Sequence, residues 1–396
     1  MAASQHERSI KPATHLHAKT RDNRIDFFRG IAMLCIFIDH IPGNFVSRLT
    51  LHNMGFSDAA ELFVLLAGVS SALAYGNHPQ SDAMILKRAG QIYLAHLALV
   101  LLVAALIAAA ALLSGENSLL HNAAVAPFVI DPLAAFTRTV SLQLQPEFID
   151  ILPLYLMLLL WLPALLRLGR YSRKLTLVVA IVIWITSIAL QINLPGPRQG
   201  GWFFNPFAWQ LIFSIGVIIG LREAKAKGET RLPRYRLMLI FAIGFLAFSF
   251  VLSAPWAQLP IMEVREFRLL PPDLVGYVSK TYLSPWRVTH VLCLTYVTAW
   301  YVPRDSNWLN SPLGVGLRGL GRKPLTMFML ASLSSYAAGV VFILYGKGLL
   351  LQICSNLVGL ALLATLGNAR GHSRTRSSCE ERLAHRAETS RGSALA

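Results

Sequence analysis

The first apolar segment of the chain reads Arg24-Ile-Asp-Phe-Phe-Arg-Gly-Ile-Ala-Met-Leu-Cys-Ile-Phe-Ile-Asp-His40. It is apolar enough to span a bilayer, yet four ionisable residues follow Arg24 within it: Asp26, Arg29, Asp39 and His40. Charged groups are costly in a lipid-spanning helix, so they indicate a functional role before a packing role. Arg29 and His40 are eleven residues apart, which places them on one helix face, roughly 16 Å apart along the axis.

Apolar segments recur along the whole chain. Of its 396 residues, 55% are hydrophobic and only 14% are charged, and the mean hydropathy is +0.52. Windows of about 19 residues predict an all-α, polytopic membrane bundle of about ten helices. The third span is long enough to tilt or to extend beyond the bilayer. The expected spans are residues 25–44, 57–76, 86–113, 148–167, 175–191, 207–222, 236–253, 287–303, 324–345 and 348–367.

The distribution of basic residues predicts the orientation of these spans, because positive loops are retained in the cytoplasm. With the N-terminus inside, 27 of the 36 Lys and Arg residues fall in cytoplasmic segments. We therefore expect both termini to be cytoplasmic. The formal net charge of +16 is explained by this topology and by anionic lipid at one membrane face, so we expect a lipid bilayer as partner and no nucleic acid.

A single domain is expected. No soluble segment of domain size interrupts the bundle, so the integral membrane domain is expected over residues 22–368. Residues 1–21 are expected to form a cytoplasmic N-terminal tail without the apolar core of a cleavable signal peptide. Residues 369–396 are expected to form a disordered cytoplasmic tail. The four cysteines have no spacing typical of metal or redox motifs, and no metal is expected.

His40 is the candidate general base. It lies at the outer end of the first expected span, where Pro42 ends the helix. A neutral imidazole there can take a proton from a hydroxyl, and an adjacent carboxylate, Asp39 or Glu61, can orient or charge it. The structural alternative is a cation that suits the helix C-terminus. We favour the functional interpretation because other ionisable residues share the span.

The second expected span opens with Asp58 and, three residues later, Glu61. This spacing fits a capping box, which is an entirely structural explanation. The span begins at the outer face next to His40, so a role for Glu61 in orienting that imidazole is equally open. The small residues around Gly68 are expected to let the first two helices approach closely.

Arg29, Asp26 and Arg88 are the candidate cofactor-binding residues. Arg29 lies about one turn into the membrane from the inner face, within reach of a phosphate entering from the cytoplasm. Asp26 can pair with Arg29 on the same helix face. Arg88 follows Lys87 at the inner start of the third span, where it suits a phosphate. The structural alternatives are a snorkelling anchor for Arg29 and a boundary residue for Arg88.

Lys280, Arg287 and His290 are the candidate substrate-binding residues. They lie at the outer entry of the eighth expected span, with Arg287 and His290 on one helix face. Such groups can bind a glycan, an anionic acyl group or a developing oxyanion. Interfacial anchoring is the alternative, which we favour for Lys280. Two further polar residues inside spans, His96 and Gln210, are expected to make hydrogen bonds between helices.

Several blocks of this sequence resemble the OpgC family. They are RIDFFRGIA at 24–32, HNMGFSDAAELFV at 52–64, NPFAWQ at 205–210, KTYLSPWRVTH at 280–290 and GRKPLTMF at 321–328. More distantly, Arg29 and His40 are similar to the arginine and histidine in the first helix of acyltransferase family 3 enzymes. Ala67 stands where that family usually has serine, and its arginine-rich entry to the third helix is reduced here to Lys87 and Arg88.

The resemblance implies a membrane O-acyltransferase of the bacterial inner membrane, because OpgC proteins succinylate osmoregulated periplasmic glucans. A short acyl group would pass from a cytoplasmic acyl-CoA, succinyl-CoA or acetyl-CoA, to a hydroxyl of a periplasmic glucan or other envelope carbohydrate. Arg29 and other inner-face basic groups would meet the phosphates, and His40 would act as general base. The alternatives are a transporter or flippase for a glycan or lipid-linked sugar, and a protein that keeps the fold without the activity.

Overall fold

In the part of the chain that the structure describes, the regular secondary structure is helical. The computed structural model describes residues 22–122, 124–196, 200–226, 233–254, 278–304 and 306–368, and it contains no β-strand within these ranges. The expected terminal tails, residues 1–21 and 369–396, lie outside the described residues. Most of the expected outer connection over residues 254–286 lies outside them as well.

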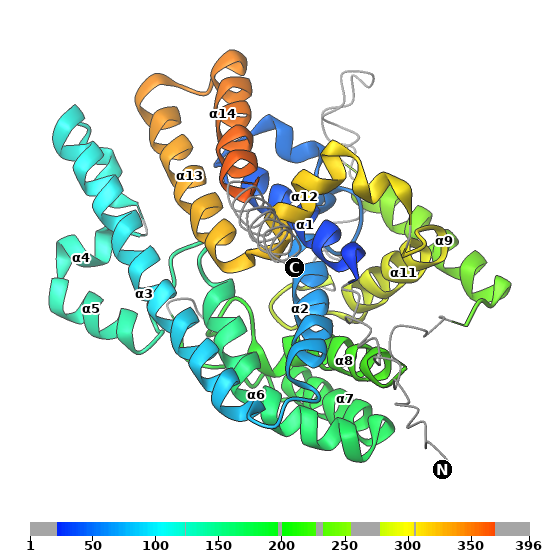
Figure 1. Ribbon diagram of the computed structural model, residues 1–396. Helices are drawn as coiled ribbons and strands as arrows, with labels where there is room; N and C mark the ends of the chain where they lie inside the picture. Colours follow the sequence, from blue (N-terminus) through cyan, green and yellow to red (C-terminus); the bar gives the residue numbers. More distant parts are fainter. Residues whose placement is uncertain are drawn as a thin grey trace, which may run out of the picture.

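Ten helices follow the ten expected spans in order (Figure 1). They are α1 Asn23–Asp39, α2 Ala59–Tyr75, α3 Ser81–Ser114, α6 Ile151–Tyr171, α7 Arg173–Ala189, α8 Pro206–Lys225, α9 Arg236–Ser253, α11 Pro285–Tyr301, α13 Pro324–Tyr345 and α14 Leu349–Asn368.

Six of these helices, α3, α6, α8, α9, α13 and α14, are long and apolar enough to cross a membrane. The protein is therefore a multi-pass membrane protein. The other four, α1, α2, α7 and α11, have 17 residues each. That length is at the lower limit for spanning a bilayer, so the count of ten spans stays a prediction.

Two helices, α1 and α3, each have one end that lies five residues from the expected boundary. The first span was expected to continue to residue 44, but α1 ends at Asp39 with His40 as its C-cap. Pro42 disfavours helical backbone at the residue before it, and Gly43 has a φ of +73°. The helix α3 has 34 residues, about 51 Å of helix, and begins five residues before the expected start. It is therefore long enough to extend beyond a bilayer.

The contacts between helices show how their directions alternate. Arg29, near the start of α1, contacts Ser70, near the end of α2, so these helices are antiparallel. We call the end of the bundle with Asn23, Tyr75 and Ser81 the start face. We call the opposite end, with His40, the start of α2 and the start of α11, the end face.

The helix α2 packs closely against α8. A Cβ added to Gly68 would lie 2.2 Å from the carbonyl oxygen of Phe213, and one added to Gly216 would lie 2.2 Å from that of Leu65. Backbones can approach this closely only where side chains are absent. Gly68 therefore packs against α8. The first two helices, which the small residues of this segment were expected to bring together, are in contact through Arg29 and Ser70.

The helix α1 has its own close partner, which the sequence analysis did not anticipate. The short helix α12, Pro312–Arg322, packs antiparallel against α1 near the start face (Figure 1). Gly321 lies against the carbonyl oxygen of Asp26, and Gly30 lies against that of Leu317. With only 11 residues, α12 is too short to be detected as a span.

Short helices occupy two of the connections. Between α3 and α6 lie η3 Asn117–His121, α4 Ala126–Ile130 and α5 Pro132–Val140. Figure 1 shows α4 and α5 beside the far part of α3. Between α1 and α2 the chain forms η1 Phe45–Leu49 and η2 Leu51–Asn53. Thr50 lies between η1 and η2 and contacts Asp39, and His52 of η2 lies near Asp58. A further short helix, η6 Asn307–Asn310, precedes α12.

Candidate functional site

The capping box at the start of α2 is confirmed. Asp58 accepts a hydrogen bond from the backbone N–H of Ala60 at 2.8 Å, and Glu61 accepts one from the N–H of Asp58 at 2.9 Å. Glu61 is completely buried. The two carboxylates therefore cap α2, which fixes them at the end face of the bundle, and each has an oxygen left for a further partner.

Those further partners are the basic residues at the start of α11. Arg287 donates from Nε to Glu61 at 2.6 Å and from Nη2 to Asp58 at 3.2 Å. Lys280 donates from Nζ to Asp58 at 2.6 Å. Two acidic and two basic side chains thus balance in a buried network, which we call the end-face network. Buried charges are tolerated only when they are paired and hydrogen-bonded in this way.

His290 lies one turn further along α11 and contacts the residue before Asp58. Its Nδ1 is 2.6 Å from the hydroxyl oxygen of Ser57 and 3.3 Å from the backbone nitrogen of Ser57. A backbone N–H can only donate, so Nδ1 accepts and the ring is the neutral tautomer with its proton on Nε2. Gly55 lies against Nε2 of the ring. His290 is therefore held firmly beside the end-face network.

His40 lies apart from these ion pairs. As the C-cap of α1, its ring lies between aromatic side chains, with its centroid 4.5 Å from that of Phe148 and 6.5 Å from that of Phe328. Its Nδ1 is buried and has no hydrogen-bond partner among the described residues. The neighbouring carboxylate, Asp39, accepts its hydrogen bond from the hydroxyl of Thr50, at 2.5 Å, and not from His40. No described carboxylate therefore orients His40 through a direct hydrogen bond.

Arg29 and Asp26 lie in the half of α1 nearer the start face, and both are buried. Arg29 donates from Nη1 to the hydroxyl of Ser70 at 3.4 Å, and its guanidinium lies 5.8 Å from the centroid of Phe63. Asp26 lies 3.6 Å from Nε of Arg322 on α12. Arg88 is only partly exposed and donates to the side chain of Gln91 at 3.1 Å.

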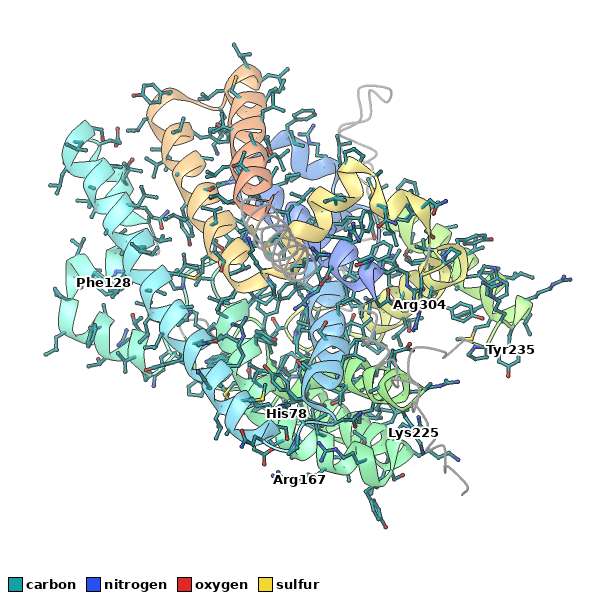
Figure 2. All side chains as sticks on the ribbon, in the orientation of Figure 1. His78, Phe128, Arg167, Lys225, Tyr235 and Arg304 are labelled. Atoms are coloured by element: carbon teal, nitrogen blue, oxygen red, sulfur yellow. The ribbon has the colours of Figure 1, made fainter. Side chains whose placement is uncertain are left out.

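An ion pair connects the start of α1 to a loop at the start face. Asp22 caps α1 through the N–H of Arg24, and it pairs with Arg24 at 2.8 Å and with Arg304 at 3.4 Å. Burial raises the pKa of Asp22, but the two guanidinium groups outweigh burial, so its pKa is lower than usual. Arg304, labelled in Figure 2, also pairs with Glu223 at the end of α8.

The structure divides the candidate residues into separate groups. Glu61, Lys280 and Arg287 meet in the end-face network, with His290 next to it. Arg29 and Asp26 lie toward the opposite face of the bundle. No cluster of three or more His, Cys, Asp or Glu side chains able to hold a metal occurs within the described ranges.

The partners of the candidate residues were harder to predict than the residues themselves. Ser57 and Asp58 lie just before Glu61, but their partners His290 in α11 and Lys280 before it are more than 220 residues away along the chain. Gln210 donates to the carbonyl oxygen of Ala180 on α7 at 2.7 Å, which confirms its expected role between helices. The same expectation for His96 was wrong, because both ring nitrogens are buried without a hydrogen bond to any described residue.

Comparison with known protein families gave one match that covers most of the chain. The family described as OpgC protein matches residues 21–375. Comparison with curated proteins and with solved structures gave no significant match. The matched range contains the end-face network, His40 and Arg29, so all the groups described above lie within the region that the family shares.

Proposed function

The chain belongs to the OpgC protein family, and from this membership we propose that it is a membrane O-acyltransferase. It moves a short acyl group, succinyl or acetyl, from acyl-CoA to a hydroxyl of a periplasmic glucan or another envelope carbohydrate. In this proposal the start face is cytoplasmic and the end face is periplasmic, as the distribution of Lys and Arg favours. The donor enters at one face, and the acceptor enters at the other.

The environment of His40 is the observation that carries this proposal. His40 is half-buried at the end face, and its buried Nδ1 makes no hydrogen bond to a described residue. A general base must be neutral and free to accept a proton when the substrate binds. Two other histidines of the end face already have partners: Nδ1 of His290 contacts Ser57, and Nδ1 of His52 lies 3.6 Å from the carboxylate of Asp58. His40 is therefore the better candidate base.

The chemistry follows from that assignment. His40 takes the proton of the acceptor hydroxyl while the hydroxyl oxygen attacks the thioester carbonyl. The new ester bond forms, the carbon–sulfur bond breaks, and the CoA thiolate leaves and is protonated. Arg29 lies nearer the start face on the same helix and contacts the donor, for which a buried guanidinium supplies paired hydrogen bonds. Asp26 and Arg88 complete the proposed donor-binding group.

The end-face network is proposed to bind the acceptor or the carboxylate of a succinyl group. Lys280 is its most accessible member, with about a quarter of its side chain exposed, and its Nζ lies 5.4 Å from the ring centroid of Phe204. An ammonium beside aromatic rings suits a site for a sugar or an acyl carboxylate. Arg287 is more deeply buried and fixes the carboxylates around Lys280.

The test uses cells that lack the native gene and carry either the wild-type protein or His40→Ala. Mass spectrometry of envelope glucans measures their acyl esters, and membrane fractionation checks that the variant inserts. We expect acyl esters with the wild-type protein and at least a hundredfold fewer with His40→Ala, because general-base catalysis typically contributes 10²–10⁴-fold.

The same samples separate the enzyme from a transporter. Full acylation by His40→Ala would refute the assignment of the base. If deletion of the gene removed the glucan itself from the envelope, and left the acyl content of the remaining glucan unchanged, a transporter or flippase would explain the protein better than an acyltransferase. The amount of glucan and its degree of acylation are therefore measured together.

A further inference from the structure

A cavity of about 630 Å³ opens at the start face, between the turn that joins α2 to α3 and the last turns of α6. Its lining includes Gly76, His78 and Ser81 from the turn and the start of α3. Arg167 and Arg170 line it from α6. Figure 2 shows His78 and Arg167 near each other at this end of the bundle. Its volume is within the usual range for pockets that bind small molecules.

The charges around this cavity favour an anion. Arg167 and Arg170 are three residues apart, so both guanidinium groups lie on one face of α6. Arg170 donates from Nε to the carbonyl oxygen of Gly76 at 3.1 Å. Within the described residues its side chain makes no other hydrogen bond. The bond to Gly76 fixes the guanidinium while its Nη groups remain available. Arg167 pairs with Asp82, the single carboxylate in the lining.

The start of α3 adds to the positive potential of the cavity. Residues of its first turn, Ser81 and Asp82, belong to the lining. Gln80, at the N-cap position, makes no side-chain capping hydrogen bond. The first-turn N–H groups of an uncapped helix carry a partial positive charge and suit an anionic ligand. Together with the two guanidinium groups, they make a site with several donors.

We propose that this cavity binds the phosphate groups of the nucleotide part of the acyl donor. This inference rests on the proposed function, which requires a donor with several phosphates at the start face. The cavity is also lined by Asn77, His78 and Gln80, whose side chains can hydrogen-bond a nucleoside. A lipid phosphate would use only the arginines and the first-turn N–H groups, and it would leave these three side chains without a role.

The position of the cavity suits a long donor that continues into the bundle. It begins at Gly76, directly after the end of α2. Ser70, six residues earlier on α2, contacts Arg29. Six helical residues correspond to about 9 Å along the axis. Arg29 is therefore about 9 Å along the axis of α2 from the cavity. A donor that carries its phosphates in the cavity is long enough to bring its acyl end near Arg29.

The test measures binding of adenosine 3′,5′-bisphosphate, which has no acyl group, to the full-length protein in phosphatidylcholine nanodiscs. Arg170→Gln removes a cavity guanidinium and is expected to weaken binding at least tenfold, because a charge-assisted hydrogen bond to the phosphate is lost. The matched control is Arg173→Gln, an exposed arginine of the same face that does not line the cavity. It is expected to bind like the wild type.

Asp82→Asn provides a test with the opposite sign. It frees Arg167 and removes the carboxylate that repels a phosphate, so binding is expected to become several-fold tighter. Equal affinities of Arg170→Gln and Arg173→Gln, or weaker binding by Asp82→Asn, would overturn the inference. So would displacement of the bisphosphate by anionic lipid with no effect of excess CoA. Acyl transfer by a protein whose cavity variants bind normally would refute the cavity site and leave the proposed function intact.

Discussion

At the scale of single residues, Arg287 has the most connected role at the end face. It joins Glu61 and Asp58, which cap α2, to the start of α11. Both the arginine and the carboxylates are buried. Removal of one partner from such a pair leaves an uncompensated charge away from water, which costs much more than loss of an exposed ion pair.

We predict that Arg287→Met strongly lowers the thermal stability of the detergent-solubilised protein. The expected cost is about 3–5 kcal/mol, because Glu61 is left buried without its cation. Arg173→Met, an exposed arginine at the start face, is the control and is expected to change stability little. The double variant Arg287→Met with Glu61→Met should lose less than the sum of the single losses. Additive losses would show that the two side chains are not coupled.

Arg29 supports a prediction about binding at the same scale. Its guanidinium lies between Ser70 and the ring of Phe63. Arg29→Lys keeps the charge but replaces a planar fork by a point charge. We predict about tenfold weaker binding of a non-reactive acyl-CoA analogue, with unchanged yield of folded protein. Arg48→Lys, at the end face, is the control. Unchanged affinity of Arg29→Lys would reduce this arginine to an anchor.

At the scale of helices, the sequence predicted most elements because apolar length is a local property. All ten expected spans correspond to helices, and the capping box of α2 is confirmed. Local patterns did not reveal which helices touch. The packing of Gly68 against α8 was not expected, and neither was α12. Helix pairing depends on how the surfaces of two helices fit together. The two helices are far apart in sequence, so a short window of residues cannot predict which of them pair.

The glycines provide a matched test of this packing. A Cβ at Gly68 would meet the backbone of α8 at 2.2 Å, whereas one at Gly90 on α3 meets nothing within 4 Å. We predict that Gly68→Ala lowers stability by about 1–3 kcal/mol, because backbone atoms must shift. Gly90→Ala should be neutral or raise stability by up to about 1 kcal/mol through helix propensity. Equal melting temperatures for the two variants would show that α2 and α8 do not approach so closely.

At the scale of the whole molecule, the bundle has two chemically different ends. The end face holds the end-face network and His40, and the start face holds the arginine-lined cavity and the anchored start of α1. Such an arrangement suits a reaction whose two substrates approach from opposite sides of a membrane. Arg29 and His40 both belong to α1, which runs from the start face to His40 at the end face and therefore connects the two ends.

The candidate site was only partly predictable. Charged groups that are costly in an apolar segment identified Arg29 and His40 from the sequence. Arg287 was identified by its position at the outer entry of the eighth expected span. Their partners could not be identified. Arg287 was expected to bind substrate, and its Nε and Nη2 donate to Glu61 and Asp58. The expected carboxylate partner of His40 is not present as a direct hydrogen bond. Contacts of this kind arise only when distant helices assemble.

Acyl transfer across a membrane by the purified protein is the most direct test of the central claim. Proteoliposomes would enclose a soluble glucan, and labelled succinyl-CoA or acetyl-CoA would be supplied outside. We predict that wild-type protein forms labelled glucan esters and that His40→Gln forms them at least a hundredfold more slowly. No labelled ester with either donor, or equal rates for wild type and His40→Gln, would contradict the account.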